Sequence, residues 1–97
     1  MKHTSSLKLA RRQAGSWLKE LREGAGLTQM ELATRLGFKY YAFVSQVETG
    51  FTRLPTEKIE GWARAVGVEP AWFARRLLSY YEPELHRVLY GLKSHAS

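Results

Sequence analysis

A short stretch of the chain carries polar and aromatic side chains that could read the edges of DNA bases. In a helix that starts near Tyr40, one outward side would present Tyr41, Ala42, Ser45 and Gln46. A glutamine can make a bidentate contact with N6 and N7 of adenine, and a serine can hydrogen-bond to more than one base. The tyrosines could pack on a thymine methyl group or bond a phosphate, while alanine allows close approach. For Tyr40, packing within the domain is an equally good interpretation.

No group of residues has the spacing of a catalytic or metal site. The three histidines, His3, His86 and His95, lack ligand spacing, and two of them lie near the ends of the sequence. The chain has no cysteine, which excludes disulfides and thiolate zinc sites. The serines lack the glycine-elbow context of a nucleophile, and no glycine-rich phosphate loop is present. We therefore expect a protein that is not an enzyme and that uses no metal or cofactor.

The stretch from Leu27 to Gly50 must position the outward side chains, and it has the pattern of two short helices joined by a tight turn. Thr28 and Glu31 have the spacing of a capping box at the start of the first helix. Gly37 suits the left-handed position that ends a helix. The second helix has an expected inner face of three apolar residues, Phe43, Val44 and Val47. This pattern is typical of a helix-turn-helix, whose second helix enters the DNA major groove.

The motifs in this stretch resemble those of the lambda-repressor-like (Xre/Cro-type) DNA-binding domain. They read T-Q-x-x-L-A-x-x-x-G from Thr28 and V-S-Q-V-E-x-G from Val44, and the resemblance covers roughly residues 16–79. It implies a compact all-α domain of five helices. The turn here is one residue longer than is common in that family. A serine or threonine usually caps the second helix of the family, whereas this chain has Lys39 and Tyr40 in its place.

The resemblance also implies roles for residues outside the second helix. It implies that Gln29 bonds a phosphate and braces the reading helix, and that Arg53 contacts the DNA backbone or the minor groove. It further implies that Arg22, late in the first helix, pairs with Glu48 inside the domain. Lys39, in the turn, could itself pair with a phosphate. A solvated lysine is an equally good interpretation, because phosphate contacts are numerous and individually unspecific.

Positive charge is concentrated in the first half of the chain. The 97 residues carry a net charge of +6. Residues 1–53 hold nine Lys/Arg against four Glu, a net of +5, whereas residues 54–97 hold six against five, a net of +1. Such a surface suits a polyanion partner. The basic segment from Lys8 to Arg12 could contact DNA phosphate or act as a minor-groove arm, although a solvated helix face is the preferred interpretation.

The length and the apolar pattern bound the class of protein. The chain is long enough for one domain with a modest core. No apolar run approaches the ~20 residues that cross a membrane. The basic N-terminus is not followed by the apolar segment of a signal peptide. We therefore expect a cytoplasmic, nucleoid-associated protein.

Helical patterns also flank the central stretch. The first helix is expected to begin at Leu7, or only at Ser16, and to end near Glu23. Gly15 falls inside the longer version, where a glycine costs about 1 kcal/mol relative to alanine. Two further helices complete the domain, starting at Pro55 and Pro70.

A sixth helix is expected after Pro83, and it carries an apolar stripe. The stripe consists of Leu85, Val88, Leu89 and Leu92, which recur at helical spacing. It could form the interface of a homodimer, which is the preferred interpretation, or fold back over the first helix. The expected organisation is a flexible N-terminus, a helix-turn-helix domain, and a C-terminal helix and tail with a possible role in dimerisation, at residues 1–6, 7–81 and 82–97.

The sequence thus predicts an all-α, five-helix lambda-repressor-like helix-turn-helix domain with an extra C-terminal helix. The expected function is that of a sequence-specific regulator of transcription that binds double-stranded DNA at promoter operators. A homodimer would bind two half-sites and either act as a repressor by occluding RNA polymerase or contact the polymerase. One alternative is an antitoxin-like module that binds DNA and a partner protein. Another is a protein-interaction domain that has lost DNA binding, against which the basic N-terminal half argues.

Overall fold

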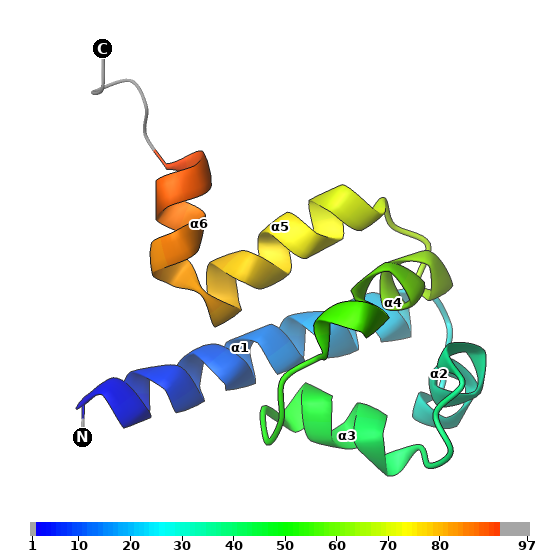
Figure 1. Cartoon of the computed structure of the whole chain (residues 1–97). Coiled ribbons are helices and arrows are strands. Elements are labelled where there is room, and N and C mark those ends of the chain that lie inside the picture. Colours follow the sequence, from blue (N-terminus) through cyan, green and yellow to red (C-terminus); the bar gives the residue numbers. More distant parts are fainter. Residues whose placement is uncertain (1, 92–97) are drawn as a thin grey trace.

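Helices make up most of the described part of the chain. The computed structural model describes the backbone of residues 2–91 and the side chains of residues 7–91. Within residues 2–91 it contains six α-helices, one short 3₁₀ helix and no strand (Figure 1). In chain order these are α1 (Lys2–Gly24), α2 (Gln29–Leu36), α3 (Ala42–Thr49), η1 (Thr56–Lys58), α4 (Ile59–Ala65), α5 (Pro70–Tyr81) and α6 (Pro83–Tyr90). The expected all-α fold with an additional C-terminal helix is confirmed.

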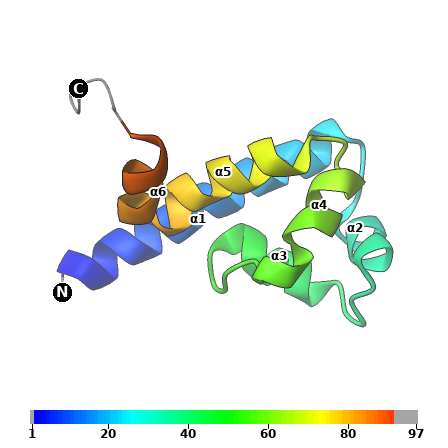
Figure 2. The same ribbon diagram turned by 45° about the horizontal axis from the view of Figure 1, so that its top comes forward.

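The long helix α1 is the scaffold on which the other elements pack. Helix α5 runs beside α1, and α3 crosses α1 on another side (Figures 1 and 2). Helices α2 and α4 pack against each other, and they connect α3 to α5 through the contacts of α2 with α3 and of α4 with α5. Helix α6 follows α5 after Glu82 and packs on α5. It rises away from the rest of the molecule in Figure 1.

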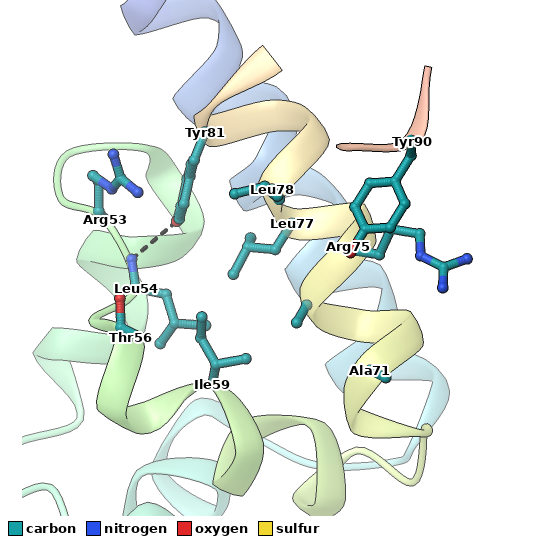
Figure 3. A pocket seen from close by; sticks show the side chains of 11 residues that line it. Arg53, Leu54, Thr56, Ile59, Ala71, Arg75, Leu77, Leu78, Tyr81 and Tyr90 are labelled. Carbon is teal, nitrogen blue, oxygen red and sulfur yellow. Dashed lines mark hydrogen bonds between the residues drawn. The ribbon is translucent and has the colours of Figure 1, made fainter. Parts of the chain in front are cut away.

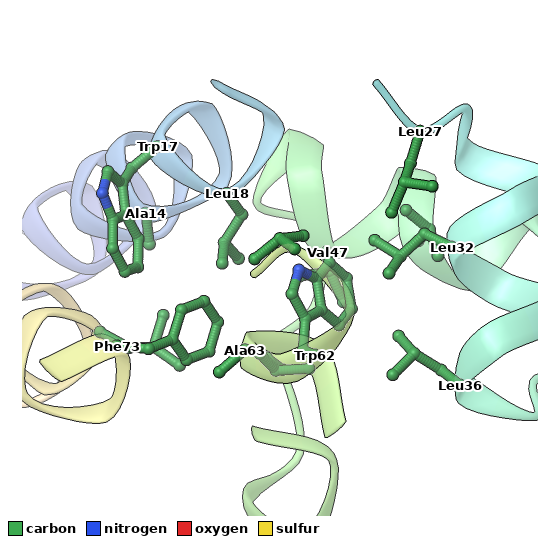
Figure 4. Close-up of a cluster of buried hydrophobic side chains, with 14 of the residues drawn as sticks. Ala14, Trp17, Leu18, Leu27, Leu32, Leu36, Val47, Trp62, Ala63 and Phe73 are labelled. Atoms are coloured by element: carbon green, nitrogen blue, oxygen red, sulfur yellow. The ribbon is translucent and has the colours of Figure 1, made fainter. Parts of the chain in front are cut away.

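A single core lies where the helices meet, with the fully buried Trp62 near its centre (Figure 4). Each of the other helices from α1 to α5 contributes to it, through Ala14, Leu18, Leu32, Val47 and Phe73. Burial of a large apolar side chain stabilises a fold by roughly 1.5–3 kcal/mol. The apolar faces expected from the sequence therefore supply the main force that fixes α3 in place.

Helices α1 and α3 approach each other so closely that side chains are excluded at two positions. A Cβ atom on Gly15 would lie 2.0 Å from the carbonyl oxygen of Glu48. A Cβ atom on Gly50 would lie 2.8 Å from the backbone nitrogen of Arg12. Gly50 also ends α3 in the left-handed conformation, with φ of 85°. Gly15 is thus required by the helix crossing, and α1 continues through it without a break.

Helix α1 begins earlier than the sequence predicts. It starts at Lys2 instead of at Leu7 or Ser16, so it includes residues 2–6, which were expected to form a flexible N-terminus. Forming the first turn of a helix is the costly step, and each later residue adds one hydrogen bond. Because the packed half of α1 supplies that first turn, the polar residues before it can extend the helix without burying apolar surface.

Candidate nucleic-acid interface

The first helix of the pair, α2, is bounded by the two local signals that its sequence contains. The backbone N–H of Glu31 donates to the Thr28 hydroxyl at 3.0 Å, and the Thr28 N–H donates to the Glu31 carboxylate at 2.8 Å. This confirms the capping box. Hydrogen bonding to the backbone N–H of Thr28, and to a smaller extent to the Thr28 hydroxyl, lowers the pKa of the Glu31 carboxyl group. At the other end, Gly37 takes the left-handed conformation, with φ of 76°.

The second helix, α3, begins at Ala42, so the expected start near Tyr40 is wrong by two residues. Tyr41 occupies the capping position without a side-chain hydrogen bond. The first turn is held by the backbone, where the Val44 N–H donates to the Tyr41 carbonyl at 3.0 Å. The ring of Phe38, from the turn, packs edge-on against that of Phe43, with centroids 4.6 Å apart. This contact holds the turn against α3 in the absence of a polar cap.

The outward side of α3 presents small and polar side chains opposite a buried apolar side. Val44 and Val47 are fully buried, whereas Gln46 is exposed. No described residue hydrogen-bonds to the side-chain amide of Gln46, whereas the Thr49 hydroxyl donates to the backbone carbonyl of Gln46. The side-chain amide is therefore able to contact a base. The residues on this side recur at the spacing of one helix face and are Ala42, Ser45, Gln46 and Thr49. Of these, only Ser45 is half-buried.

Three consecutive residues form an exposed patch at the N-terminal end of α3. They are Lys39, Tyr40 and Tyr41, and the two tyrosines are 66% and 52% exposed. The Lys39 ammonium lies 5.5 Å from the centroid of the Tyr40 ring. Packing within the domain, the alternative for Tyr40, is therefore not what the structure shows. The patch leaves the three side chains accessible beside the outward side of α3.

A buried hydrogen-bond network joins α1, α2 and α3. The Arg22 guanidinium donates to both carboxylate oxygens of Glu48, at 2.7 and 3.1 Å, and to the Leu27 carbonyl at 2.7 Å. Arg22 and Glu48 are only 7% and 6% exposed, which confirms the internal pair. The hydrogen bond with Glu48 raises the pKa of Arg22. Gln29 donates to the Glu48 carboxylate at 3.0 Å, so it braces the end of α3, while its phosphate contact stays a prediction.

Arg53 lies in the loop after α3 and is held against the junction of α5 and α6. It donates to the Glu82 carboxylate at 2.9 Å, and its guanidinium lies 4.6 Å from the centroid of the Tyr81 ring. The Tyr81 hydroxyl in turn accepts from the Leu54 N–H at 3.0 Å (Figure 3). Burial raises the pKa of Tyr81. Sequence reasoning missed these contacts, and the DNA contact of Arg53 stays a prediction.

A groove of about 360 Å³ opens beside Arg53, between the loop, α4 and α5 (Figure 3). Its lining is mainly apolar and includes Leu54, Ile59, Leu77, Leu78 and Tyr90. Tyr90 comes from α6, and the Arg75 guanidinium lies over its ring, 4.8 Å from the ring centroid. Residues of α6 and of the loop that follows α3 therefore line the same groove.

The apolar stripe of α6 is exposed. Leu85, Val88 and Leu89 are 47%, 63% and 53% exposed, and Leu92 lies outside the described residues. Leu7 at the start of α1 is also 52% exposed. The stripe therefore does not cover the first helix, which was the alternative to a dimer interface.

Comparison with known proteins identifies the domain. Residues 13–76 match the family model described as a helix-turn-helix domain, from the middle of α1 to the middle of α5. The chain belongs to this helix-turn-helix family. A search of curated proteins gave no match. The match confirms that this helix-turn-helix protein resembles lambda-repressor-like domains. The first half of α1 and the whole of α6 lie outside the matched region.

The part of the chain that the structure describes has neither a membrane-spanning helix nor a cluster of metal ligands. None of its helices is both long enough and apolar enough to cross a bilayer. No group of three or more histidine, aspartate or glutamate side chains there could hold a metal ion.

Proposed function

We propose that this helix-turn-helix protein is a sequence-specific, double-stranded DNA-binding regulator of transcription that acts at promoter operators in the cytoplasm. The outward side of α3 carries the proposal, because it presents free polar side chains on a helix whose other side is buried. The network of Arg22, Glu48 and Gln29 braces that helix. A rigid helix with accessible polar side chains is what reading of the major groove requires. The positive charge of residues 1–53 supplies attraction to phosphate.

The side chains on the outward side of α3 and in the patch beside it have different roles in this proposal. Gln46 contacts adenine, Ser45 bonds a base edge, and Ala42 allows α3 to approach closely. Tyr40 and Tyr41 pack on thymine methyl groups or bond phosphate, and Lys39 pairs with a phosphate.

Gln29 and Arg53 contact the DNA backbone in different ways. The Gln29 amide nitrogen carries two hydrogens, so it can donate to a phosphate while the other hydrogen stays bonded to Glu48. Arg53 reaches a phosphate by exchanging its Glu82 partner for the DNA, because the pair is exposed on the surface.

Replacing Gln46 by alanine should relax sequence preference at one base pair. A bidentate contact contributes about 1–3 kcal/mol of discrimination between bases, and the exposed side chain is not needed for folding. Lys39→Ala should instead weaken binding to all sequences similarly. It should also reduce the slope of log K against log salt by about 1, the value for one phosphate contact. Anisotropy titrations with a series of duplexes that differ at single base pairs would measure both. If the two variants show the same sequence profile, the assignment of Gln46 as a reader of bases is wrong.

We further propose that the protein works as a homodimer, with the exposed stripe of α6 in the interface. A two-fold dimer needs a self-complementary patch, and an apolar helix face can supply one. Two copies of α3 would then read two half-sites. Binding at a promoter would exclude RNA polymerase or place a surface against it. The same stripe also suits the second candidate, an antitoxin-like module, in which a partner protein covers α6.

Replacing Val88 by aspartate should dissociate the dimer without unfolding the protomer. Val88 is 63% exposed, so the protomer loses little on substitution, whereas charged residues are depleted from interface cores. We expect the dimer dissociation constant to rise by at least about tenfold, which corresponds to about 1.4 kcal/mol. Sedimentation equilibrium would measure it, with thermal melting to check the fold. The control is Met30→Ser on α2, which removes a similarly exposed apolar side chain away from α6. An unchanged dimer in Val88→Asp would rule out this interface, and a monomeric wild type would favour the antitoxin-like alternative.

A further inference from the structure

We propose that the first half of α1 binds a phosphate of the DNA that α3 reads, through a basic hollow at the end of α3. The hollow is formed by Lys8, Arg11 and Arg12 of α1 together with Thr49, Gly50 and Phe51. The three basic residues precede residue 13, where the match to the helix-turn-helix family begins. The inference rests on the proposed DNA binding and extends it to a segment outside that family's domain.

The hollow has the charge that a phosphate requires. It has a volume of about 510 Å³, and none of the six residues that line it is acidic. Lys8, Arg11 and Arg12 form no ion pair with any residue whose side chain is described. Lys8 and Arg12 are four residues apart on one helix, where like charges repel each other. An anion between them removes that repulsion.

The position of the hollow is fixed by the backbone. The close approach of Gly50 to the backbone of Arg11 and Arg12 presses the end of α3 against α1. In Figures 1 and 2 the end of α3 lies beside the middle of α1. The cationic side chains are therefore carried on the same rigid unit as the reading helix, and no loop has to move to bring them together.

The outward side of α3 leads directly into the hollow. Thr49 belongs to both, since it follows Gln46 on the outward side and also lines the hollow. A helix of eight residues is about 12 Å long, and the major groove is about 12 Å wide. In the proposed orientation α3 lies across the groove, so its last turn reaches the sugar-phosphate wall. The hollow meets a phosphate there, and Phe51, which is 74% exposed, offers an apolar surface to the sugar.

The test is the salt dependence of binding by the full chain, measured by anisotropy on a duplex selected by the wild-type protein from a random pool. Arg12→Gln, and Lys8→Gln with Arg12→Gln, should reduce the slope of log K against log salt by about 0.9 for each lost contact, with unchanged base preference. Arg12→Lys should keep the slope, which separates charge from packing. The control is Arg76→Gln, which removes the same charge from α5, where Arg76 lies over the Trp17 ring. Its slope should equal that of the wild type.

Neutral methylphosphonate linkages in the same duplex locate the contact. One linkage at the wall of the groove should weaken the wild type and leave Arg12→Gln unaffected. If the wild type selects a sequence but the α1 variants keep its slope of log K against log salt, the proposed phosphate contact is wrong while the proposed function stands. If the wild type selects no sequence, both the proposed function and the proposed phosphate contact are wrong.

Discussion

Replacing Arg22 by methionine is expected to lower the free energy of unfolding by about 3–5 kcal/mol, because the change leaves Glu48 buried without its partner. The carboxylate would keep only the Gln29 amide, at 3.0 Å. The Leu27 carbonyl would lose the guanidinium that now donates to it at 2.7 Å. Urea unfolding followed by circular dichroism measures the loss.

A double-mutant cycle separates the pair from the general cost of changing Arg22. The double variant Arg22→Met with Glu48→Leu should be much more stable than the two single changes predict when added, because neither leaves a buried charge. The control is Arg64→Met, which breaks the exposed pair with Glu60 and should cost less than about 1 kcal/mol. Additive effects at Arg22 and Glu48 would contradict the buried pair.

Replacing Gly15 by alanine is expected to lower the free energy of unfolding by about 3 kcal/mol, at the upper end of the range for overpacked sites. The new Cβ would lie 2.0 Å from the Glu48 carbonyl oxygen, and that atom belongs to the backbone of α3 and cannot rotate away. Helix propensity alone would give the opposite sign, since alanine favours a helix over glycine by about 1 kcal/mol. The sign of the change therefore decides whether the close crossing exists.

Gly24 supplies the matched control at the end of the same helix. A Cβ atom there would meet nothing within 4 Å, so Gly24→Ala should leave stability unchanged or slightly raised. Thermal or urea unfolding of the two variants side by side makes the comparison. Equal stability of Gly15→Ala and Gly24→Ala would show that α1 and α3 do not approach as closely as described.

The parts of the fold that local signals specify could be predicted from the sequence. The capping box of Thr28 and Glu31 and the glycine at 37 act within a few residues, so they bound α2 correctly. The inner face of α3 follows from helical spacing, although Phe43 is only half-buried. The Arg22–Glu48 pair joins residues 26 apart, and only the resemblance to a known family pointed to it.

The parts that depend on contacts between distant segments could not be predicted. Gly15 carries no local mark of the α3 backbone that lies against it. The pair of Arg53 and Glu82 spans 29 residues, and neither side chain has an unusual local pattern. The sequence predicts the start of α3 two residues too early, because the chain lacks the polar cap that is common in the family and an aromatic contact and backbone bonds hold the first turn in its place. For the candidate interface, the sequence indicated which face of α3 points outward but not the basic hollow beside it.

Selection from a pool of random duplexes tests the proposed DNA reading most directly. The wild-type protein should enrich a two-fold symmetric sequence with half-sites about one helical turn, roughly 10–10.5 base pairs, apart. Affinity for that sequence should fall steeply as salt rises, with a slope of about −0.9 for each phosphate contact. A pool that stays random after repeated selection, with binding that does not depend on salt, would contradict the proposal that α3 reads DNA.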